Sequence, residues 1–264
     1  MPPPRKRFGQ NFLTDRHALE RIVTALELNG TERVVEIGPG RGALTDLLVR
    51  QAREVVAVEI DRDLTRVLRT RYAAVPSVTI VEGDVLDLDL AALGGEGYSL
   101  VGNVPYYVTT PIIFHALAFP RPRVAVFLVQ REVAERLVAA PGSSAFGALT
   151  ANVQSLAAVE VVGHVGAGAF FPKPKVESTI VRFRPLAAPL VAPAEERAIS
   201  QFIVGLFGQR RRQLLRAVRT VTGHGAEQVA RLLARVELDA SVRAETLAPA
   251  RLVHLARAAL ADEA

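Results

Sequence analysis

The tetrapeptide Asn103-Val104-Pro105-Tyr106, which follows the glycine-rich segment 36–42 in the chain, carries the clearest chemistry. The exocyclic amine of adenine is a weak nucleophile, because its lone pair is delocalised into the ring. The side-chain oxygen of Asn103 and a nearby backbone carbonyl can both accept its N–H bonds, which returns the lone pair to the nitrogen. Pro105 would hold the turn, since proline fixes φ at about −65°, and Tyr106 offers a flat face for the base. The pattern predicts methyl transfer to a base amine.

A cofactor site is expected where the predicted strand 33–37 runs into Gly38-Pro39-Gly40-Arg41-Gly42. Glycine lets the backbone turn sharply and approach a ligand closely, so Gly38 and Gly40 are candidate cofactor-binding residues. Glu59, at the end of the second predicted strand, can accept hydrogen bonds from both hydroxyls of a ribose. These residues therefore predict a nucleoside-containing cofactor.

Two classes of protein fit these glycines. A dinucleotide-dependent dehydrogenase also has a glycine-rich turn and an acid about 20 residues further on, but its glycine spacing is G-x-G-x-x-G. Here the spacing is G-x-G-x-G, and Glu36 precedes the loop. Glu36 would repel a pyrophosphate, yet it suits the cationic amino-acid end of S-adenosylmethionine. The motif therefore favours a methyltransferase.

A third acid supports this interpretation. Gly83-Asp84-Val85 follows the third predicted strand, 78–82. Asp84 can accept the adenine N6–H of the cofactor, while Val85 packs against the ring. The alternative is an Asp that only caps the turn after the strand. Because Asp84 follows Glu36 and Glu59 in chain order, the cofactor role is favoured, and the expected cofactor is S-adenosylmethionine.

Parallel strands connected by helices must position these residues. Over the first 130 residues short apolar runs alternate with helical patterns, which is typical of βα units. The expected strands are 33–37, 55–59, 78–82, 98–102 and 123–129, and the expected helices are 15–28, 43–52, 62–74, 110–118 and 131–140. Two further strands, 158–165 and 177–184, leave little room for a crossover helix and predict a hairpin with one antiparallel strand at the sheet edge. This is the α/β, Rossmann-like fold of class I methyltransferases, with a seven-stranded, mostly parallel sheet.

Prolines mark the end of the predicted sheet domain. Three of them lie in 185–193, a stretch with neither a helix nor a strand period, which indicates a linker. Beyond it apolar residues recur at three- and four-residue spacing, which predicts helices. We expect a methyltransferase domain over 1–185 and a small all-α domain over 194–264.

Composition excludes several other classes. The chain of 264 residues has no cysteine, which excludes disulfides, thiolate metal sites and cysteine nucleophiles. Its five histidines are scattered without a ligand spacing, so no metal is expected. No apolar run approaches the roughly 20 residues of a membrane span, and we expect a cytoplasmic protein. The net charge of +5 favours contact with phosphates, although an arginine-rich composition alone also gives a basic protein.

Several segments, in this order, resemble the KsgA/RsmA family, the small-subunit ribosomal RNA adenine N6-dimethyltransferases. They are 7–13, 36–42, 103–111, 170–178 and 206–214, so the similarity covers essentially the whole chain. The resemblance implies S-adenosylmethionine as donor and two adjacent adenosines near the 3′ end of 16S rRNA as acceptors, each methylated twice at N6. It also implies a monomeric enzyme whose partner is 16S rRNA or an assembly intermediate of the 30S subunit.

The resemblance assigns roles to individual residues. Asn11 and Leu13 would close over the cofactor. The residues that would line its site are Gly38, Glu59, Asp84 and Asn103. Tyr106 and Phe170 would sandwich the target base. Without the family context, Phe170 would be assigned to the core.

A basic face is expected to dock the RNA. In the helical domain it comprises Arg210, Arg211, Arg212, Arg216 and Arg219. A solvated helix face is the alternative. Candidate contacts beside the active site are Arg5, Lys6, Arg7, Lys173 and Lys175. The family more often has Arg-Arg-Lys-Thr-Leu near 210–214, a departure that concerns docking rather than chemistry.

Three alternatives share part of this pattern. The 23S rRNA adenine methyltransferase of macrolide resistance has the same catalytic motifs, but segments 107–111 and 170–176 favour the small-subunit enzyme. A DNA adenine methyltransferase would more often have Asp/Asn-Pro-Pro-Tyr. An assembly factor that acts only by binding would not need Asn103, Glu59 and Asp84, which argue for activity, although the two roles can coexist.

Overall fold

The structure, a computed structural model, describes residues 2–5 and 8–261. The chain folds into two compact units. The first comprises Met1–Ala134 and Ala158–Pro185, and the second Glu135–Ala157 and Leu186–Ala264. The predicted domains placed 135–157 with the sheet. Here this segment groups with the C-terminal helices, because its helix α7 (Ala148–Gln154) packs against α8 (Glu196–Gly208).

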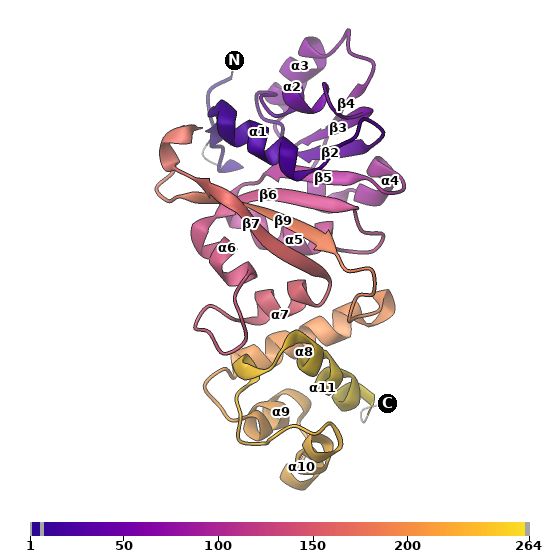
Figure 1. Cartoon of the computed structure of the whole chain (residues 1–264), viewed down its shortest axis with the longest axis vertical. Helices are drawn as coiled ribbons and strands as arrows, with labels where there is room; N and C mark the ends of the chain where they lie inside the picture. The colour runs from indigo at the N-terminus through magenta and orange to yellow at the C-terminus, as the bar shows by residue number, and fades with distance from the viewer. Residues whose placement is uncertain (1, 6–7, 262–264) are drawn as a thin grey trace. The chain divides into compact units, whose positions relative to one another are not determined.

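The first unit is built on a seven-stranded sheet. In spatial order its strands are β4 (Val78–Glu82), β3 (Glu54–Glu59), β2 (Arg33–Ile37), β5 (Ser99–Asn103), β6 (Val124–Gln130), β9 (Ser178–Pro185) and β7 (Ala157–Val165). The neighbours from β4 to β6 pair in parallel, and β9 pairs antiparallel to β6. Figure 1 shows these strands side by side. The predicted seven-stranded, mostly parallel fold is confirmed.

The position of the reversed strand in the sheet differs from the prediction. We predicted it at the sheet edge, but β9 lies between β6 and β7, and β7 forms the edge. The burial of the two strands explains the order. Five of the eight positions of β9 are buried, whereas β7 is buried only at its two ends, Ala157 and Val165. A strand that is buried on both faces is stabilised in the interior of a sheet, and a half-exposed strand tolerates the edge.

Helices connect the strands of the sheet, and some of them begin at side-chain caps. They are α1 (Arg16–Ala25), α2 (Thr45–Leu48), α3 (Arg62–Arg71), α4 (Leu90–Gly94), α5 (Thr109–Ala116) and α6 (Arg131–Leu137). Asp15 caps α1 and Asp61 caps α3, each by accepting a backbone N–H in the first turn of the helix. The α1 residues Leu19 and Ile22 pack in one core cluster with Val126 of β6. The expected helix 43–52 shortens to α2, and α4 was not expected.

A second, two-stranded sheet joins distant parts of the first unit. Strand β1 (Phe12–Leu13) pairs antiparallel with β8 (Phe170–Phe171), with Phe12 opposite Phe171 and Leu13 opposite Phe170. The backbone N–H of Thr14 extends the pairing by donating to the Ala169 carbonyl at 2.8 Å. This pairing fixes the N-terminal segment against the stretch 166–176.

The second unit is helical, as predicted. Its remaining helices are α9 (Leu214–Thr222), α10 (Ala226–Arg235) and α11 (Pro249–Ala261). Helix α8 packs against α7, α9 and α11 (Figure 1). The core includes Phe146, whose ring centroid lies 5.9 Å from that of Phe207. Among the described residues no helix is both long and apolar enough to cross a membrane.

Candidate active site

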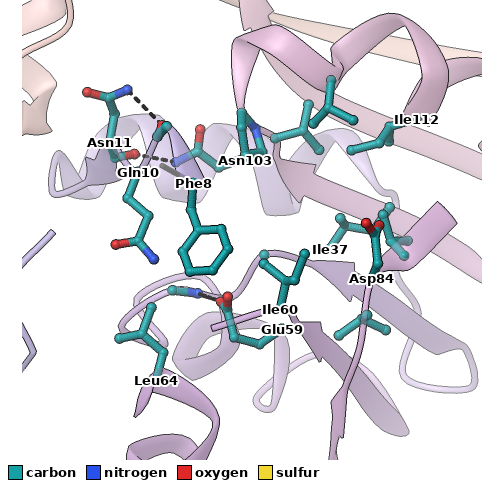
Figure 2. Close-up of a pocket in the computed structure, with 18 of the residues that line it drawn as sticks. Phe8, Gln10, Asn11, Ile37, Glu59, Ile60, Leu64, Asp84, Asn103 and Ile112 are labelled. Atoms are coloured by element: carbon teal, nitrogen blue, oxygen red, sulfur yellow. Dashed lines mark hydrogen bonds between the residues drawn. The ribbon is translucent and has the colours of Figure 1, made fainter. Parts of the chain in front are cut away.

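An open cavity with about 950 Å³ of empty space lies at the carboxyl ends of the parallel strands. Its lining includes Ile37 of β2, Glu59 of β3 and Asn103 of β5, together with Asp84 just after β4. Ligands bind at this edge of open α/β sheets, because the strand ends and the loops that follow them form a crevice there. Figure 2 shows Glu59, Asp84 and Asn103 around the same space. Two of the three acids predicted from the sequence, Glu59 and Asp84, therefore meet Asn103 in one site, whereas Glu36 is not among its lining residues.

The glycine loop after β2 needs its glycines for two reasons. Gly38, Gly40 and Gly42 have φ values of +67°, +59° and +83°, a region that favours glycine. At Gly40 a Cβ atom would also lie only 2.9 Å from the ring of Phe12. The loop can therefore pass closely beneath the N-terminal segment only with glycine at this position.

Glu59 is held rigidly at the end of β3. Its two carboxylate oxygens accept backbone N–H bonds, Oε2 from Gly40 at 3.1 Å and Oε1 from Asp61 at 2.9 Å. The side chain is 4% exposed, and burial raises the pKa of Glu59. In Figure 2 it points into the cavity from the side opposite Asn103. This orientation suits an acceptor for the paired hydroxyls of a ribose.

Another part of the cavity combines the carboxylate of Asp84 with apolar side chains. Asp84 is exposed and caps the short helix η2 (Val85–Asp87), where its Oδ1 accepts the Leu86 N–H at 3.0 Å. Val85 is buried beside it, and Ile60, directly after Glu59, is 43% exposed and lines the same cavity. An adenine ring fits such a recess, since its faces are apolar and its amine can donate to a carboxylate.

Asn103 has a defined amide orientation. Its Nδ2 donates to the Asn11 carbonyl at 2.9 Å, and a carbonyl can only accept. The contact therefore sets which end of the amide faces the N-terminal segment (Figure 2). None of the other described residues donates a hydrogen bond to Oδ1. This oxygen is available to accept a hydrogen bond from a ligand.

The residues after Asn103 form a rigid turn. Pro105 has φ −59°, close to the expected value. Its carbonyl accepts from the backbone N–H of Val108 and from Thr109 Oγ1, both at 3.2 Å. Val104 is 1% exposed, so its side chain anchors the turn in the core. The turn leads into the short helix η3 (Tyr106–Val108).

Tyr106 is anchored by its hydroxyl, which lies 2.7 Å from Ser178 Oγ. Burial raises the pKa of the Tyr106 phenol, whereas the hydrogen bond to Ser178 lowers it. Its ring lines the cavity, as does the neighbouring Tyr107, which is 69% exposed. Tyr106 therefore lies in the lining of the cavity, and its role as a wall for the base stays a prediction.

The structure does not bring Phe170 to this cavity. Its side chain is 5% exposed and packs in the core cluster with Leu13, Val165 and Ile180. The pairing of β8 with β1 turns Phe170 inward, and its neighbour Phe171 is the exposed ring, at 53%. The core alternative for Phe170 therefore describes its position, and a sandwich with Tyr106 would require this side chain to leave the core.

A second cavity adjoins the first. Both are lined by Phe12, Gly38, Gly40 and Asn103. The second also contains Leu13 and Glu36, so Leu13 faces this cavity rather than the first. Glu36 is 1% exposed and accepts from Thr45 Oγ1 at 2.6 Å. Burial raises the pKa of Glu36 to about 8, and the nearby carboxylates of Glu59 and Asp46 act in the same direction.

Some lining residues were assigned no role from the sequence. Phe8 and Gln10 reach the cavity from the N-terminal segment, and Figure 2 shows the Phe8 ring between Asn103 and Glu59. No spacing rule indicates such residues, because the segment reaches the site only through tertiary contacts. Ile60 had a signal, since it is apolar and directly follows an acid at a strand end.

The fold and the site together define a class of protein. A seven-stranded sheet with one reversed strand, a G-x-G-x-G loop after β2 and acids at the following strand ends are the features of a class I methyltransferase. The chain belongs to the ribosomal RNA adenine dimethylase family, whose model matches residues 3–255. It is an rRNA adenine dimethyltransferase that uses S-adenosylmethionine as its methyl donor.

Similar proteins agree with this assignment. Ribosomal RNA small subunit methyltransferase A of Synechococcus sp. (strain JA-3-3Ab) is 44% identical over 256 residues, covering 94% of this chain and 90% of the relative. The protein of the same name from Geobacter metallireducens is 38% identical, covering 97% and 96%. The resemblance to the small-subunit family is therefore confirmed.

Two solved structures have the same fold. A dimethyladenosine transferase from Plasmodium falciparum superposes with a TM-score of 0.81 at 23% identity, covering 92% of this chain and 95% of the other. The 23S rRNA methyltransferase ErmE superposes with a TM-score of 0.71 at 27% identity, covering 94% and 99%. Identity to ErmE is lower than to the small-subunit relatives, which favours the small-subunit enzyme over the 23S alternative.

Proposed function

We propose that this enzyme dimethylates N6 of two adjacent adenosines near the 3′ end of 16S rRNA, on an assembly intermediate of the 30S subunit. The observation that carries the chemistry is Asn103, whose Nδ2 is engaged by the Asn11 carbonyl at 2.9 Å while Oδ1 is left to accept. The choice of RNA is supported by the small-subunit methyltransferases that are 38% to 44% identical to this chain.

Different residues of the site would contact different parts of the methyl donor, S-adenosylmethionine. When bound, S-adenosylmethionine supplies an electrophilic methyl group on its sulfonium sulfur. Glu59 would accept from the ribose hydroxyls, and Asp84 from the adenine amine, with Val85 against the ring. Glu36 would face the ammonium group from the second cavity, while Asn11 and Leu13 close the site from the N-terminal segment. Gly38 and Gly40 leave room for this close approach.

The target adenine must leave its stack to reach this site, as in other base-modifying enzymes. Asn103 Oδ1 and the Val104 carbonyl would accept the two N6–H bonds, which directs the nitrogen lone pair toward the methyl group. Tyr106, anchored to Ser178, would stack on the base. No strong base is needed, because the N6 proton becomes acidic once the nitrogen is methylated. Positioning and electrostatic stabilisation then supply most of the rate enhancement.

We assign Phe170 no role in binding the target base, because its side chain lies in the core. Fully exposing a buried phenylalanine costs about 1.5–3 kcal/mol, and Phe170 is 5% exposed. If Phe170 left the core to stack on the base, the stacking would have to offset this free energy of exposure. The exposed rings near the site are instead Tyr107 and Phe171, at 69% and 53%.

Docking of the RNA is proposed to involve the basic face of the second unit. Arg211, Arg212, Arg216 and Arg219 are exposed. Arg210 differs from them, because its guanidinium pairs with Glu245 and donates to the Ser144 carbonyl at 2.7 Å. We therefore assign Arg210 to the structure of this unit and the other four arginines to phosphate contact. Replacement of the four with Ala should weaken RNA binding and reduce its salt dependence.

Fewer of the basic residues beside the active site remain candidates for contact with the RNA than the sequence predicted. Lys173 and Lys175 are exposed and remain candidates, whereas Arg5 pairs with Asp61 and Asp63. Lys6 and Arg7 lie outside the described residues. Because small ribosomal subunits are assembled in the cytoplasm, the proposed substrate places the enzyme there, and we propose that it acts as a monomer.

One experiment tests the proposed substrate. The protein and labelled S-adenosylmethionine are incubated with small subunits that lack the modification, in parallel with large subunits and with DNA. We expect label only in small-subunit RNA, recovered as N6,N6-dimethyladenosine at two adjacent positions. Label in large-subunit RNA or DNA would overturn the proposal. The variant Asn103→Ala in the same assay separates catalysis from a binding role in assembly.

A further inference from the structure

The N-terminal arm, defined here as residues 2–5 and 8–13, is tied to the loop after β3 by charged and polar contacts. Arg5 Nη1 lies 3.0 Å from Asp61 Oδ1, and its other terminal nitrogen pairs with Asp63. Gln10 Nε2 donates to Asp61 Oδ2 at 3.0 Å, while its Oε1 accepts the Arg5 N–H at 2.8 Å. Both oxygens of Asp61 therefore hold the arm.

The other end of the arm reaches the catalytic turn. The Asn11 carbonyl accepts from Asn103 Nδ2 at 2.9 Å, and Phe12 lies over Gly40 before pairing with Phe171. Arg41 adds a further tie, since its Nη2 donates to the Pro2 carbonyl at 3.2 Å. The arm thus spans the cavity from the side of Glu59 to the side of Asn103 (Figure 2).

We propose that Arg5 and Gln10, with Asp61 and Asp63, form a latch that closes the arm over the bound cofactor. Through the Asn11 carbonyl the closed arm also holds the Asn103 amide with Oδ1 toward the target amine. The second part rests on the role of Asn103 in the proposed function, whereas the first does not. Arg5 and Gln10 are positioning residues, since neither needs to touch the reacting atoms.

The burial of Asp61 explains why these contacts act as a latch. Its side chain is 1% exposed, and Arg5 is the only cation paired with it in the described parts of the chain. With the arm closed, Asp61 is shielded from water, so its contacts with Arg5 and Gln10 are stronger than the same contacts at an exposed site. When the arm opens, Asp61 keeps its cap to the Asp63 N–H, at 3.1 Å, but loses Arg5 and Gln10. The closed arm is therefore the favoured state, and it must open for the cofactor to exchange.

The latch predicts a change in cofactor exchange that needs no RNA. We compare Arg5→Ala with Arg16→Ala, which removes an exposed arginine that pairs only with Glu20 among the described residues. For Arg5→Ala we expect the Kd for S-adenosylmethionine, measured by calorimetry, to rise about tenfold, which equals about 1.4 kcal/mol. The dissociation rate, measured by displacement with S-adenosylhomocysteine, should rise by a similar factor. Added salt should weaken binding to the wild type more than to Arg5→Ala.

A charge exchange separates the latch from a general loss of structure. Asp63 is 38% exposed and tolerates a larger side chain, so Arg5→Asp combined with Asp63→Arg should recover part of the affinity that Arg5→Asp loses. Hydrogen exchange of the amides of 8–13 gives a second readout. Cofactor should protect these amides in the wild type and in Arg16→Ala, but much less in Arg5→Ala.

Two results would overturn the latch. One is equal cofactor affinity, dissociation rate and arm protection in the two single variants. The other is failure of the charge exchange to recover affinity while both chains remain folded by circular dichroism. Failure of the rRNA assay with these cofactor results intact would instead contradict the proposed substrate.

Discussion

Affinity for S-adenosylmethionine should rise with pH, because Glu36 must ionise to face the cofactor's ammonium group. In the free protein Glu36 is 1% exposed and accepts from Thr45 Oγ1 at 2.6 Å. Burial raises its pKa to about 8, with the carboxylates of Glu59 and Asp46 acting in the same direction and Thr45 in the opposite one. Glu36 is therefore mostly protonated at neutral pH in the absence of cofactor.

The pKa of Glu36 sets the size of the expected change in the Kd for S-adenosylmethionine. At pH 7 a carboxyl group with a pKa of about 8 is roughly one-tenth ionised, so ionisation before binding costs about 1.4 kcal/mol, or about tenfold in Kd. The sign is set by the raised pKa: a proton is bound below about pH 8 and must be released on binding. Kd should therefore fall about tenfold from pH 6 to pH 7 and about fivefold from pH 7 to pH 8.

The same shift affects stability with the opposite sign. The folded, cofactor-free protein binds the Glu36 proton more tightly than the unfolded chain, whose pKa is near 4.5. The free energy of unfolding should therefore decrease as the pH rises through the window from 4.5 to about 8. Bound cofactor should reduce this decrease.

Calorimetry tests the prediction directly. At pH 7, in two buffers with different ionisation enthalpies, binding to the wild type should release close to one proton. The control is Glu36→Gln, which keeps the shape of the side chain but cannot ionise, so that only the cofactor's own amine still titrates. If the two proteins have the same pH slope and the same proton release, Glu36 does not control the pH dependence.

Three further predictions concern other parts of the site. Asn103→Ala should lower kcat by about 10²–10³-fold, the usual cost of one preorganised polar group, while the cofactor Kd by calorimetry stays near that of the wild type. Gly40→Ala should weaken cofactor binding, because the new Cβ lies 2.9 Å from the Phe12 ring at φ +59°; an unchanged Kd would contradict the close packing. Phe170→Ala should destabilise the protein by about 3–5 kcal/mol in denaturant unfolding, whereas a selective loss of kcat with normal stability would restore the base-stacking role.

Much of the sheet was predictable, because its central strands are buried on both faces. Strands β2, β3 and β6 are short apolar runs, and such runs are readily distinguished from the helices between them. The glycine loop and the turn around Pro105 were also predictable, since their backbone geometry restricts the residue types. Local sequence could not give the order of β7 and β9, which depends on what each strand packs against.

Two residues, Phe170 and Arg210, have surroundings that differ from those expected from the sequence. Phe170 was assigned to the base and is in the core, because its pairing with Leu13 joins segments far apart in the chain. Arg210 was grouped with four other arginines, but an ion pair with Glu245 separates it from them. Neither partner is indicated by spacing, since both contacts form only after the chain folds.

By itself the sequence determined the class of fold, the cofactor and the chemistry on an adenine amine. These depend on residue types at short spacing, as in 36–42 and 103–106, where the backbone geometry and the reacting groups are local. Only the tertiary structure decided that Asn103 is oriented by Asn11, that Asp61 holds the N-terminal arm, and that Glu36 is buried enough to keep its proton. These properties depend on burial and on contacts between distant segments, which a linear pattern does not encode.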